Sequence, residues 1–323
     1  MSKCIIITTI NSPSKQLLSY TSQPGWDLIV VGDSKTDDSL YWGLNCIYLG
    51  IKEQKEQFPT LFDKIPLRSY TRKMFGYLYA IKNKYSVIYD TDDDNKYTED
   101  IDKYESNVAI KSCSTPGFVN IYRNFTDENI WPRGIPPCHQ SIDVIPVLTD
   151  KDVNMKIAVI QGLVNNDPDV DAYYRINVKN TPFNFEKNPG YDIILDKYSV
   201  CPFNTQNTFW NDPSTFYAMY LPISVTFRYT DILRGFIALY QLWKHNKTIK
   251  FTFPTAVQDR NEHDLSKDYE SEEPMYKTAE QVIQLLNENR DAGLNDIYRV
   301  LCNHGIIQET EFEALNEWLR LVQ

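Results

Sequence analysis

A short apolar run that ends in a cluster of carboxylates constrains this chain most. Residues 87–89 are Val-Ile-Tyr, and the next five positions hold four carboxylates: Asp90, Asp92, Asp93 and Asp94. A short β-forming run bounded by polar residues predicts a buried strand. Open α/β sheets bind ligands at the carboxyl ends of their strands. Because four like charges this close repel, the pattern favours a bound cation, and carboxylates suit Mg²⁺ or Mn²⁺.

The order of the preceding elements indicates the fold class. Residues 4–9 and 27–32 are apolar and β-branched, so we expect buried strands there, with a short helix over 14–22 between them. Residues 46–49 predict a third strand. Strand, helix and strand joined by short loops are typical of a parallel α/β sheet flanked by helices.

A helix is predicted over residues 67–85, directly before the acidic strand. One apolar face repeats at helical spacing through Met74, Tyr77, Leu78 and Ile81. Arg72 and Lys73 lie in its first turns. Gly76 is tolerated in a helix at a cost of about 1 kcal/mol and usually has a packing reason. We therefore expect this helix to pack against the sheet beside the carboxylates.

The C-terminal part is predicted to be helical. Residues 259–276 carry many charges without an apolar period, so a loop is expected there. Three segments with apolar faces follow: 278–289, 294–303 and 309–322. The predicted organisation is one α/β domain over residues 1–275, with a small helical tail over 276–323.

The acidic cluster has competing interpretations. A solvated acidic turn is the simplest. A calcium loop of the EF-hand type fails on spacing, because the sixth residue from Asp90 is Asn95 rather than Gly and the twelfth is Ile101 rather than Glu. A phosphatase with an aspartyl nucleophile also begins D-x-D, but normally has Thr or Val where Asp94 stands. A nucleotide-sugar site needs carboxylates that hold a cation bridging two phosphates.

Composition narrows the class of partners. The net charge of −10 argues against non-specific nucleic-acid binding and against an anionic membrane surface. We expect no signal peptide and no membrane span, and hence a cytoplasmic protein. The Lys-, Asn- and Ile-rich composition suits an AT-rich genome, such as that of a large virus or a protist. If the source is a virus, we expect the protein in the host cytoplasm or the virion. No G-x-S-x-G, P-loop, G-x-G-x-x-G or H-E-x-x-H motif occurs.

Further candidates lie outside the acidic cluster. Arg72 and Lys73 are expected to pair with a diphosphate or with the acidic loop, unless they lie in a solvated first turn. Asp33 and Lys35 follow the second predicted strand, where α/β folds often hold a base or ribose, although a solvated loop is the alternative. His263 could complete a metal shell, although a loop histidine is more often solvated.

Several blocks together resemble the STELLO-type glycosyltransferases of plants and invertebrates. They include Trp131-Pro-Arg-Gly and Gln258-Asp-Arg-Asn-Glu-His, together with residues 11–13, 32–36, 70–81, 87–95, 161–172, 204–208 and 221–235. The resemblance runs in order over roughly residues 4–270. A fainter similarity, in the Asp-Asp-Asp run and the Arg-Tyr-x-Asp block, extends to the reversibly glycosylated polypeptides, which are plant UDP-arabinopyranose mutases.

The resemblance implies a GT-A fold, a Rossmann-type sheet that binds a nucleotide sugar. By position, nucleotide contacts fall on Asn11, Asp33 and Lys35, and the family's basic helix carries Tyr70, Arg72, Lys73 and Tyr77. The metal ligands would be Asp92 and Asp94, which share one side of an extended loop, with His263 as a third. Sugar or ribose hydroxyls would bind Asp90 and Asp93.

The expected function is a metal-dependent glycosyltransferase. It would move a sugar from a nucleoside-diphosphate sugar, with UDP as the expected nucleotide, to an unidentified glycan, protein or small-molecule acceptor, with Mn²⁺ or Mg²⁺. The alternatives are a non-catalytic carbohydrate- or nucleotide-sugar-binding protein and a UDP-sugar mutase. Asp231 is expected to contact the acceptor or act as a base, which would imply inversion, or else to cap the following helix. The aromatic content of 13% and the tail leave room for a homodimer.

Overall fold

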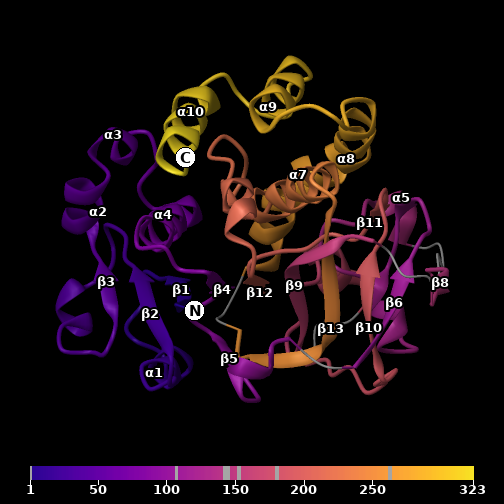
Figure 1. The fold of residues 1–323 in the computed structure, drawn as a ribbon, viewed down its shortest axis with the longest axis horizontal. Helices are drawn as coiled ribbons and strands as arrows, with labels where there is room; N and C mark the ends of the chain where they lie inside the picture. The colour runs from indigo at the N-terminus through magenta and orange to yellow at the C-terminus, as the bar shows by residue number, and fades with distance from the viewer. Residues whose placement is uncertain (1, 106–107, 141–145, 151–153, 179–181, 261–263) are drawn as a thin grey trace.

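The protein is built around one large mixed sheet. The computed structural model describes residues 2–105, 108–140, 146–150, 154–178, 182–260 and 264–323. The sheet order is β3 (Ile47–Leu49), β2 (Trp26–Val31), β1 (Lys3–Thr8), β4 (Val87–Thr91), β12 (Asn207–Trp210), β9 (Lys156–Asn165), β13 (Lys247–Gln258), β10 (Tyr191–Leu195), β6 (Ala109–Cys113) and β8 (Leu148–Thr149), with β5 (Asn95–Tyr97) paired to β13 (Figure 1). The predicted α/β class, a sheet flanked by helices, is confirmed.

The N-terminal half of the sheet matches the sequence prediction. Strand β1 pairs in parallel with both β2 and β4, and β2 pairs in parallel with β3. The helix α1 (Lys15–Tyr20) connects β1 to β2, and the Ser14 hydroxyl caps it by accepting from the Leu17 amide at 2.9 Å. Parallel pairing brings the carboxyl ends of β1, β2 and β4 to one edge, beside the acidic cluster.

The other half departs from a purely parallel sheet. Strand β12 runs antiparallel to both β4 and β9, whereas β9 and β13 run parallel to each other. The sequence did not predict β12, because its segment mixes amides with aromatics instead of repeating apolar residues. Its central position nevertheless leaves all four of its residues buried.

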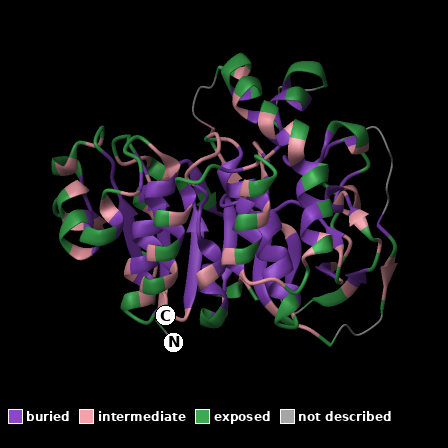
Figure 2. Ribbon diagram, turned by 90° about the horizontal axis from the view of Figure 1, so that it is seen from above, coloured by how far each residue is buried: buried purple, intermediate pink, exposed green. Residues whose placement is uncertain are grey.

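Helices cover both faces of the sheet. They are α2 (Ile51–Gln57), α3 (Pro59–Phe62), η2 (Tyr70–Lys73), α4 (Met74–Lys82), α5 (Pro137–Gln140), α6 (Ala172–Asn177), η5 (Pro213–Met219), α7 (Thr230–Lys244), α8 (Leu265–Glu288), α9 (Leu294–Asn303) and α10 (Glu311–Leu321), with shorter 3₁₀ turns at 38–41, 101–103 and 121–124. A two-stranded sheet pairs β7 (Gly117–Phe118) with β11 (Ser199–Val200). Figure 2 shows the sheet buried and the outer helix faces exposed.

The prediction of a loop over residues 259–276 is wrong. Helix α8 begins at Leu265, capped by the Asp264 carboxylate, and runs without interruption past Pro274. Its buried positions in this stretch follow helical spacing, but the first two are acids, Asp268 and Glu272. An apolar-only pattern therefore missed it. Because α8 crosses residue 275, no break in secondary structure marks the division between 1–275 and 276–323, which stays a prediction.

The C-terminal helices pack on the main body. The Trp318 indole of α10 donates to the Tyr217 carbonyl at 2.9 Å, and the buried Glu311 carboxylate accepts from the Tyr220 hydroxyl at 2.6 Å. Within the described residues, none of the helices combines the length and the apolarity that crossing a membrane requires.

Gly76 allows α4 to approach the sheet closely. A Cβ at this position would lie 2.7 Å from Cγ2 of Ile6 and 2.9 Å from Cγ2 of Val31. We expect Gly76→Val to lower the free energy of unfolding by about 2 kcal/mol or more, because β-branched neighbours cannot move aside. Denaturant unfolding measures the change. Gly293→Ala, where a Cβ meets nothing nearer than 3.7 Å, is the control, and an equal loss there would contradict the packing explanation.

Candidate functional site

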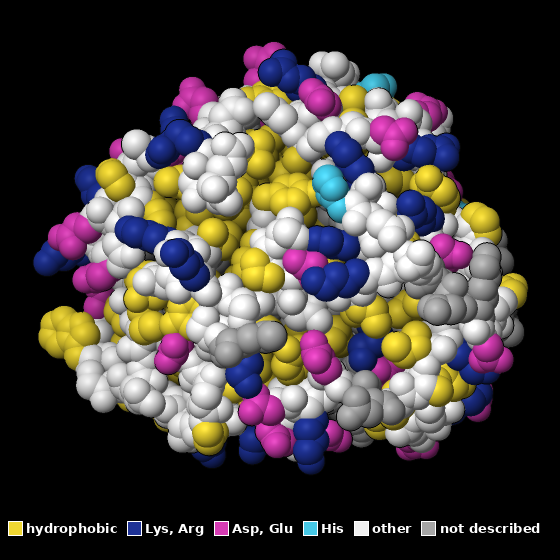
Figure 3. Space-filling view, viewed as in Figure 1, with side chains coloured by type: hydrophobic (Ala, Val, Ile, Leu, Met, Phe, Trp, Pro, Cys, Tyr) yellow, Lys and Arg dark blue, Asp and Glu magenta, His cyan; other side chains and the backbone are white. Residues whose placement is uncertain are grey.

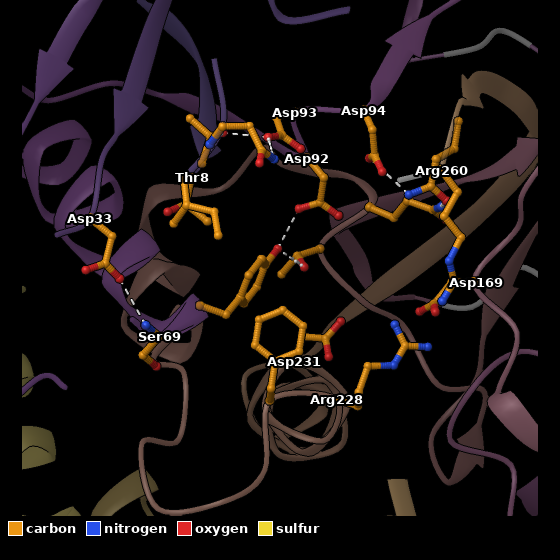
Figure 4. A pocket seen from close by; sticks show the side chains of 18 of the residues that line it. Thr8, Asp33, Ser69, Asp92, Asp93, Asp94, Asp169, Arg228, Asp231 and Arg260 are labelled. Carbon is orange, nitrogen blue, oxygen red and sulfur yellow. Dashed lines mark hydrogen bonds between the residues drawn. The ribbon is translucent and has the colours of Figure 1, made fainter. Parts of the chain in front are cut away.

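A cavity of about 500 Å³ opens at the carboxyl ends of β1, β2 and β4. Its far wall comes from the start of α7, the end of β13 and the segment between β9 and α6. Most of the predicted contact residues line it: Asn11, Asp33, Lys35, Tyr70, Asp92, Asp93, Asp94 and Asp231 (Figure 4). On the face in Figure 3, Lys and Arg side chains gather beside carboxylates near the centre, the same mixture of charges that lines the cavity.

Asp92 is held from the helix side. Its Oδ1 accepts from the Tyr70 hydroxyl at 2.7 Å and lies 3.2 Å from the Lys73 ammonium. Burial raises the pKa of Asp92 above its usual range, although Lys73 and Tyr70 oppose the rise. The side chain is 27% exposed, so it remains open to the cavity.

Asp93 and Asp94 are held by other segments. The Asp93 Oδ2 accepts from the Thr9 hydroxyl at 2.5 Å and the Asn11 amide at 2.9 Å, which ties it to the end of β1. The Asp94 Oδ1 accepts from the Gln258 amide at 3.0 Å, which ties it to the end of β13. The acidic loop therefore joins both halves of the sheet.

Asp90 lies beneath this loop and does not line the cavity. It is fully buried, and its carboxylate lies 2.7 Å from the Lys73 ammonium and accepts from the Tyr77 hydroxyl at 2.7 Å. Burial raises the pKa of Asp90, opposed by Lys73 and Arg234. Asp90, Lys73 and Tyr77 therefore do not line the cavity as expected of ligand contacts. Their polar atoms bind one another under its floor, and Lys73 pairs with the acidic loop, which was the alternative expectation.

Arg72 also departs from its expected place. Its guanidinium is fully buried and donates to the Gln54 side chain at 2.9 Å and the Ile65 carbonyl at 3.0 Å. The reason is local. Residues 70–73 form a 3₁₀ turn, in which side chains three apart point the same way. Tyr70 and Lys73 therefore both reach Asp92, and Arg72 does not.

The opposite wall carries arginines that sequence reasoning did not single out: Arg133, Arg175, Arg228 and Arg260. Arg133 contacts Asp231 through Nη1 at 3.0 Å and Nη2 at 2.8 Å, and contacts Asp169 through Nε at 2.7 Å. Burial opposes its charge, but the two carboxylates raise the pKa of Arg133 well above its usual value. Three of these arginines lie in the motif blocks quoted above, which was the available signal.

Asp231 is not the cap of its helix. Tyr229 holds that position in α7 without a side-chain hydrogen bond, and Asp231 lies in the first turn. The capping alternative is therefore wrong. The Asp231 carboxylate instead forms a bidentate pair with Arg133. Figure 4 shows Asp231 and Asp92 projecting toward the same central space from opposite sides.

The donors for a metal ion are present in part. His263 lies outside the described residues. Among the residues that are described, only Cys138, His139 and Glu280, away from this cavity, bring three metal-binding atoms within 4.8 Å of one another. Asp92 and Asp94 nevertheless offer the carboxylate oxygens that Mg²⁺ and Mn²⁺ prefer, on one face of the cavity. The donor chemistry fits such an ion.

Two curated relatives from Arabidopsis thaliana are similar to the chain. It is 26% identical to the probable glycosyltransferase STELLO1 over 79% of this chain and 35% of that protein, and 25% identical to STELLO2 over 98% and 44%. The resemblance drawn from the motifs is thereby confirmed. The chain spans less than half the length of these relatives. No family model matches it.

Solved structures show a weaker likeness. Glucosyl-3-phosphoglycerate synthase from Mycobacterium tuberculosis, in complex with phosphoglyceric acid, has a TM-score of 0.42 at 8% identity and covers 91% of this chain and 82% of its own. Mouse xyloside xylosyltransferase 1 has a TM-score of 0.19 at 13% identity, over 46% and 64%. Likenesses of this size do not bear on the site.

The buried Lys73 ammonium is expected to matter for stability. Lys73→Met leaves the Asp90 carboxylate without its nearest cation, so we expect the free energy of unfolding to fall by about 3–5 kcal/mol. Adding Asp90→Asn removes the stranded charge and should recover part of the loss. Urea unfolding measures all three proteins.

The control for this prediction is Lys52→Met. Lys52 lies 3.9 Å from Glu56 on the surface of α2, and both side chains are largely exposed. Its loss should stay within about 0.5 kcal/mol. Equal effects of Lys52→Met and Lys73→Met would contradict a special role for the buried pair.

Proposed function

We propose that this chain is a metal-dependent glycosyltransferase that takes its sugar from a nucleoside-diphosphate sugar, with UDP as the nucleotide. The observation that carries the proposal is the acidic loop after β4, whose three carboxylates line a cavity at the carboxyl ends of parallel strands. The similarity to two probable glycosyltransferases supports it. A GT-A arrangement, in which this edge of the sheet holds the nucleotide sugar, is part of the proposal.

The nucleotide would bind beside the ends of β1 and β2. Asp33 is buried there, and its carboxylate accepts from the Ser34 amide at 2.5 Å and the Ser69 amide at 3.0 Å. These contacts order the loop after β2 against the start of η2. We assign Asp33, Lys35 and Asn11 to the nucleotide, with Lys35 offsetting phosphate charge.

Asp92 and Asp94 would hold Mg²⁺ or Mn²⁺, with His263 as a proposed third ligand. Such an ion acts as a Lewis acid on the leaving diphosphate. Tyr70 and Lys73 hold Asp92 in place, and Gln258 holds Asp94. Asp93, bound to Thr9 and Asn11, would fix the loop and meet a sugar or ribose hydroxyl.

Four predicted contact residues take a supporting role in this proposal. Asp90, Lys73 and Tyr77 form the buried network under the loop, and Arg72 anchors η2 to α2 and to the segment before it. They would position the carboxylates without touching substrate. Lys73 also compensates the charge of Asp92 when no ligand does.

Asp231 is proposed to receive the acceptor proton. The acceptor hydroxyl oxygen would form a bond to the anomeric carbon, the bond from that carbon to the diphosphate oxygen would break, and the diphosphate would leave with the electron pair. The proton would pass to Asp231, and attack on the face opposite the leaving diphosphate would invert the anomeric carbon. Arg133 holds both oxygens of Asp231 and so fixes the direction in which the carboxylate faces.

Binding of UDP tests the proposal directly. We expect Mn²⁺ to tighten UDP binding in calorimetry, and Asp92→Ala combined with Asp94→Ala to abolish this dependence, because the oxygen donors are lost. The control is Asp291→Ala with Asp296→Ala, two exposed carboxylates that do not line the cavity. No UDP binding with or without metal would rule out the enzyme and the mutase alike.

Asp231→Asn separates chemistry from binding. The amide keeps the shape of the side chain but is a poor proton acceptor, so kcat should fall by about 100-fold or more with little change in UDP affinity. Activity is followed as UDP release with product analysis, which also distinguishes transfer from ring isomerisation by a mutase. An unchanged kcat would remove Asp231 from the reaction.

A further inference from the structure

Three arginines on the far wall of the cavity have no part in the scheme above. Arg175, Arg228 and Arg260 come from α6, from the turn before α7 and from the segment after β13, and all three line the cavity. We refer to them as the arginine cluster. Figure 4 shows Arg228 and Arg260 on the side of the cavity away from Asp33.

Each guanidinium of the cluster is held by a carboxylate that does not line the cavity. Arg175 lies 2.5 Å from Asp167, Arg228 lies 2.7 Å from Glu272, and Arg260 lies 2.8 Å from Asp268. Asp268 and Glu272 are one turn apart on α8, and Glu272 is fully buried. The guanidinium groups of the cluster therefore line the cavity, whereas the carboxylates that hold them do not.

Glu272 is a structural hub as well as a counter-ion. It accepts from the Arg228 Nε at 2.9 Å, the Ala172 amide at 2.7 Å and the Tyr276 hydroxyl at 2.6 Å. It thereby fixes the start of α6 and the start of α7 on α8. Glu272 thus positions Arg228, while Asp167 and Asp268 hold Arg175 and Arg260, and guanidinium groups held in place suit recognition of a planar or tetrahedral anion.

The three guanidiniums also repel one another. Burial, then Arg175 and Arg228, lower the pKa of Arg260 to about 10, and Asp167 and Asp268 oppose them. Arg260 therefore remains charged at neutral pH. A negatively charged group in the cavity would relieve this repulsion and satisfy guanidinium N–H groups at the same time.

The arginine cluster and the proposed donor site lie at different ends of the cavity. Lys35 and Arg68 line the end beside Asp33, where they can offset the charge of the donor diphosphate. The arginine cluster lies past the acidic loop, on the wall that also carries Asp231. Beside it, Phe227 is 58% exposed and lines the cavity, with its ring 5.7 Å from that of Tyr70, so an apolar face is available to a sugar ring.

We infer that the arginine cluster is the acceptor subsite and that the acceptor is a small sugar or polyol carrying a phosphate or a carboxylate. This inference rests on the proposed function, because it takes the Asp33 end of the cavity as the donor end. It adds the chemical class of the acceptor, which the acidic loop alone does not specify.

Matched sugars test the inference. Glucose, glucose 6-phosphate and glucuronate share a ring and differ at one carbon, so they separate charge from shape and phosphate from carboxylate. We expect the full chain with UDP and Mn²⁺ to bind at least one of the two charged sugars about tenfold or more tightly than glucose in calorimetry. Equal binding of all three, or of none, would overturn the inference.

Variants connect this preference to the cluster. Arg260→Gln should remove most of the charge preference while UDP binding stays unchanged. Arg228→Gln combined with Glu272→Gln should do the same. Because this double variant leaves no buried carboxylate unpaired, it replaces the single arginine variants if they do not fold. Arg299→Gln, an exposed arginine on α9, is the control and should keep the preference. Circular dichroism checks that each variant is folded.

The two proposals fail in different ways. In one outcome UDP does not bind, but the protein still binds charged sugars more tightly than glucose, and this preference is lost in Arg260→Gln and kept in Arg299→Gln. The cluster would then be an anion site, and the donor assignment would fall. If UDP binds but Arg260→Gln retains the charge preference, the acceptor assignment falls alone. A loss of UDP affinity in the cluster variants with the preference intact would assign these arginines to the donor diphosphate and overturn the inference.

Discussion

The buried ion pair of Lys73 and Asp90 is the interaction on which the rest of the candidate site depends. Neither side chain is exposed, and the ammonium lies 2.7 Å from the carboxylate. The pair joins η2 to the end of β4, at the point where the strand becomes the acidic loop. Because Lys73 also contacts Asp92 and the Thr91 carbonyl, one cation sets the direction of the loop. Removing a buried charge of this kind strands its partner, so the arrangement is strongly specified.

The cavity is organised around two charged walls. One is acidic and belongs to the parallel half of the sheet, where β1, β2 and β4 end together. The other holds arginines, two of which, Arg228 and Arg260, pair with acids of α8. Arg133 lies on this second wall and contacts both of its carboxylates, Asp169 and Asp231. A chain with a net charge of −10 thus gathers several arginines in one cavity, which total charge does not reveal.

Much of the N-terminal half could be predicted from local patterns. The strands at β1, β2, β3 and β4 are short apolar runs, and α4 repeats apolar residues at helical spacing, so periodicity was sufficient. Arg72 was misplaced because a 3₁₀ turn, not an α-helix, orients residues 70–73. The first part of α8 was missed because acids occupy its first two buried positions, whereas its later part was predicted as the helix over 278–289. The arginine cluster escaped because its three members come from segments far apart in sequence, at residues 175, 228 and 260.

By itself, the sequence determined the α/β class, the acidic end of β4 and the similarity to the STELLO proteins, since each depends on residues close together or on ordered blocks. Only the tertiary structure decided which carboxylates face the cavity. Asp90 and Asp92 are two positions apart, yet one is sealed under Lys73 and Tyr77 while the other is partly open. The physical reason is that burial and charge pairing arise between segments, and a strand end exposes whichever side chains its neighbours leave uncovered.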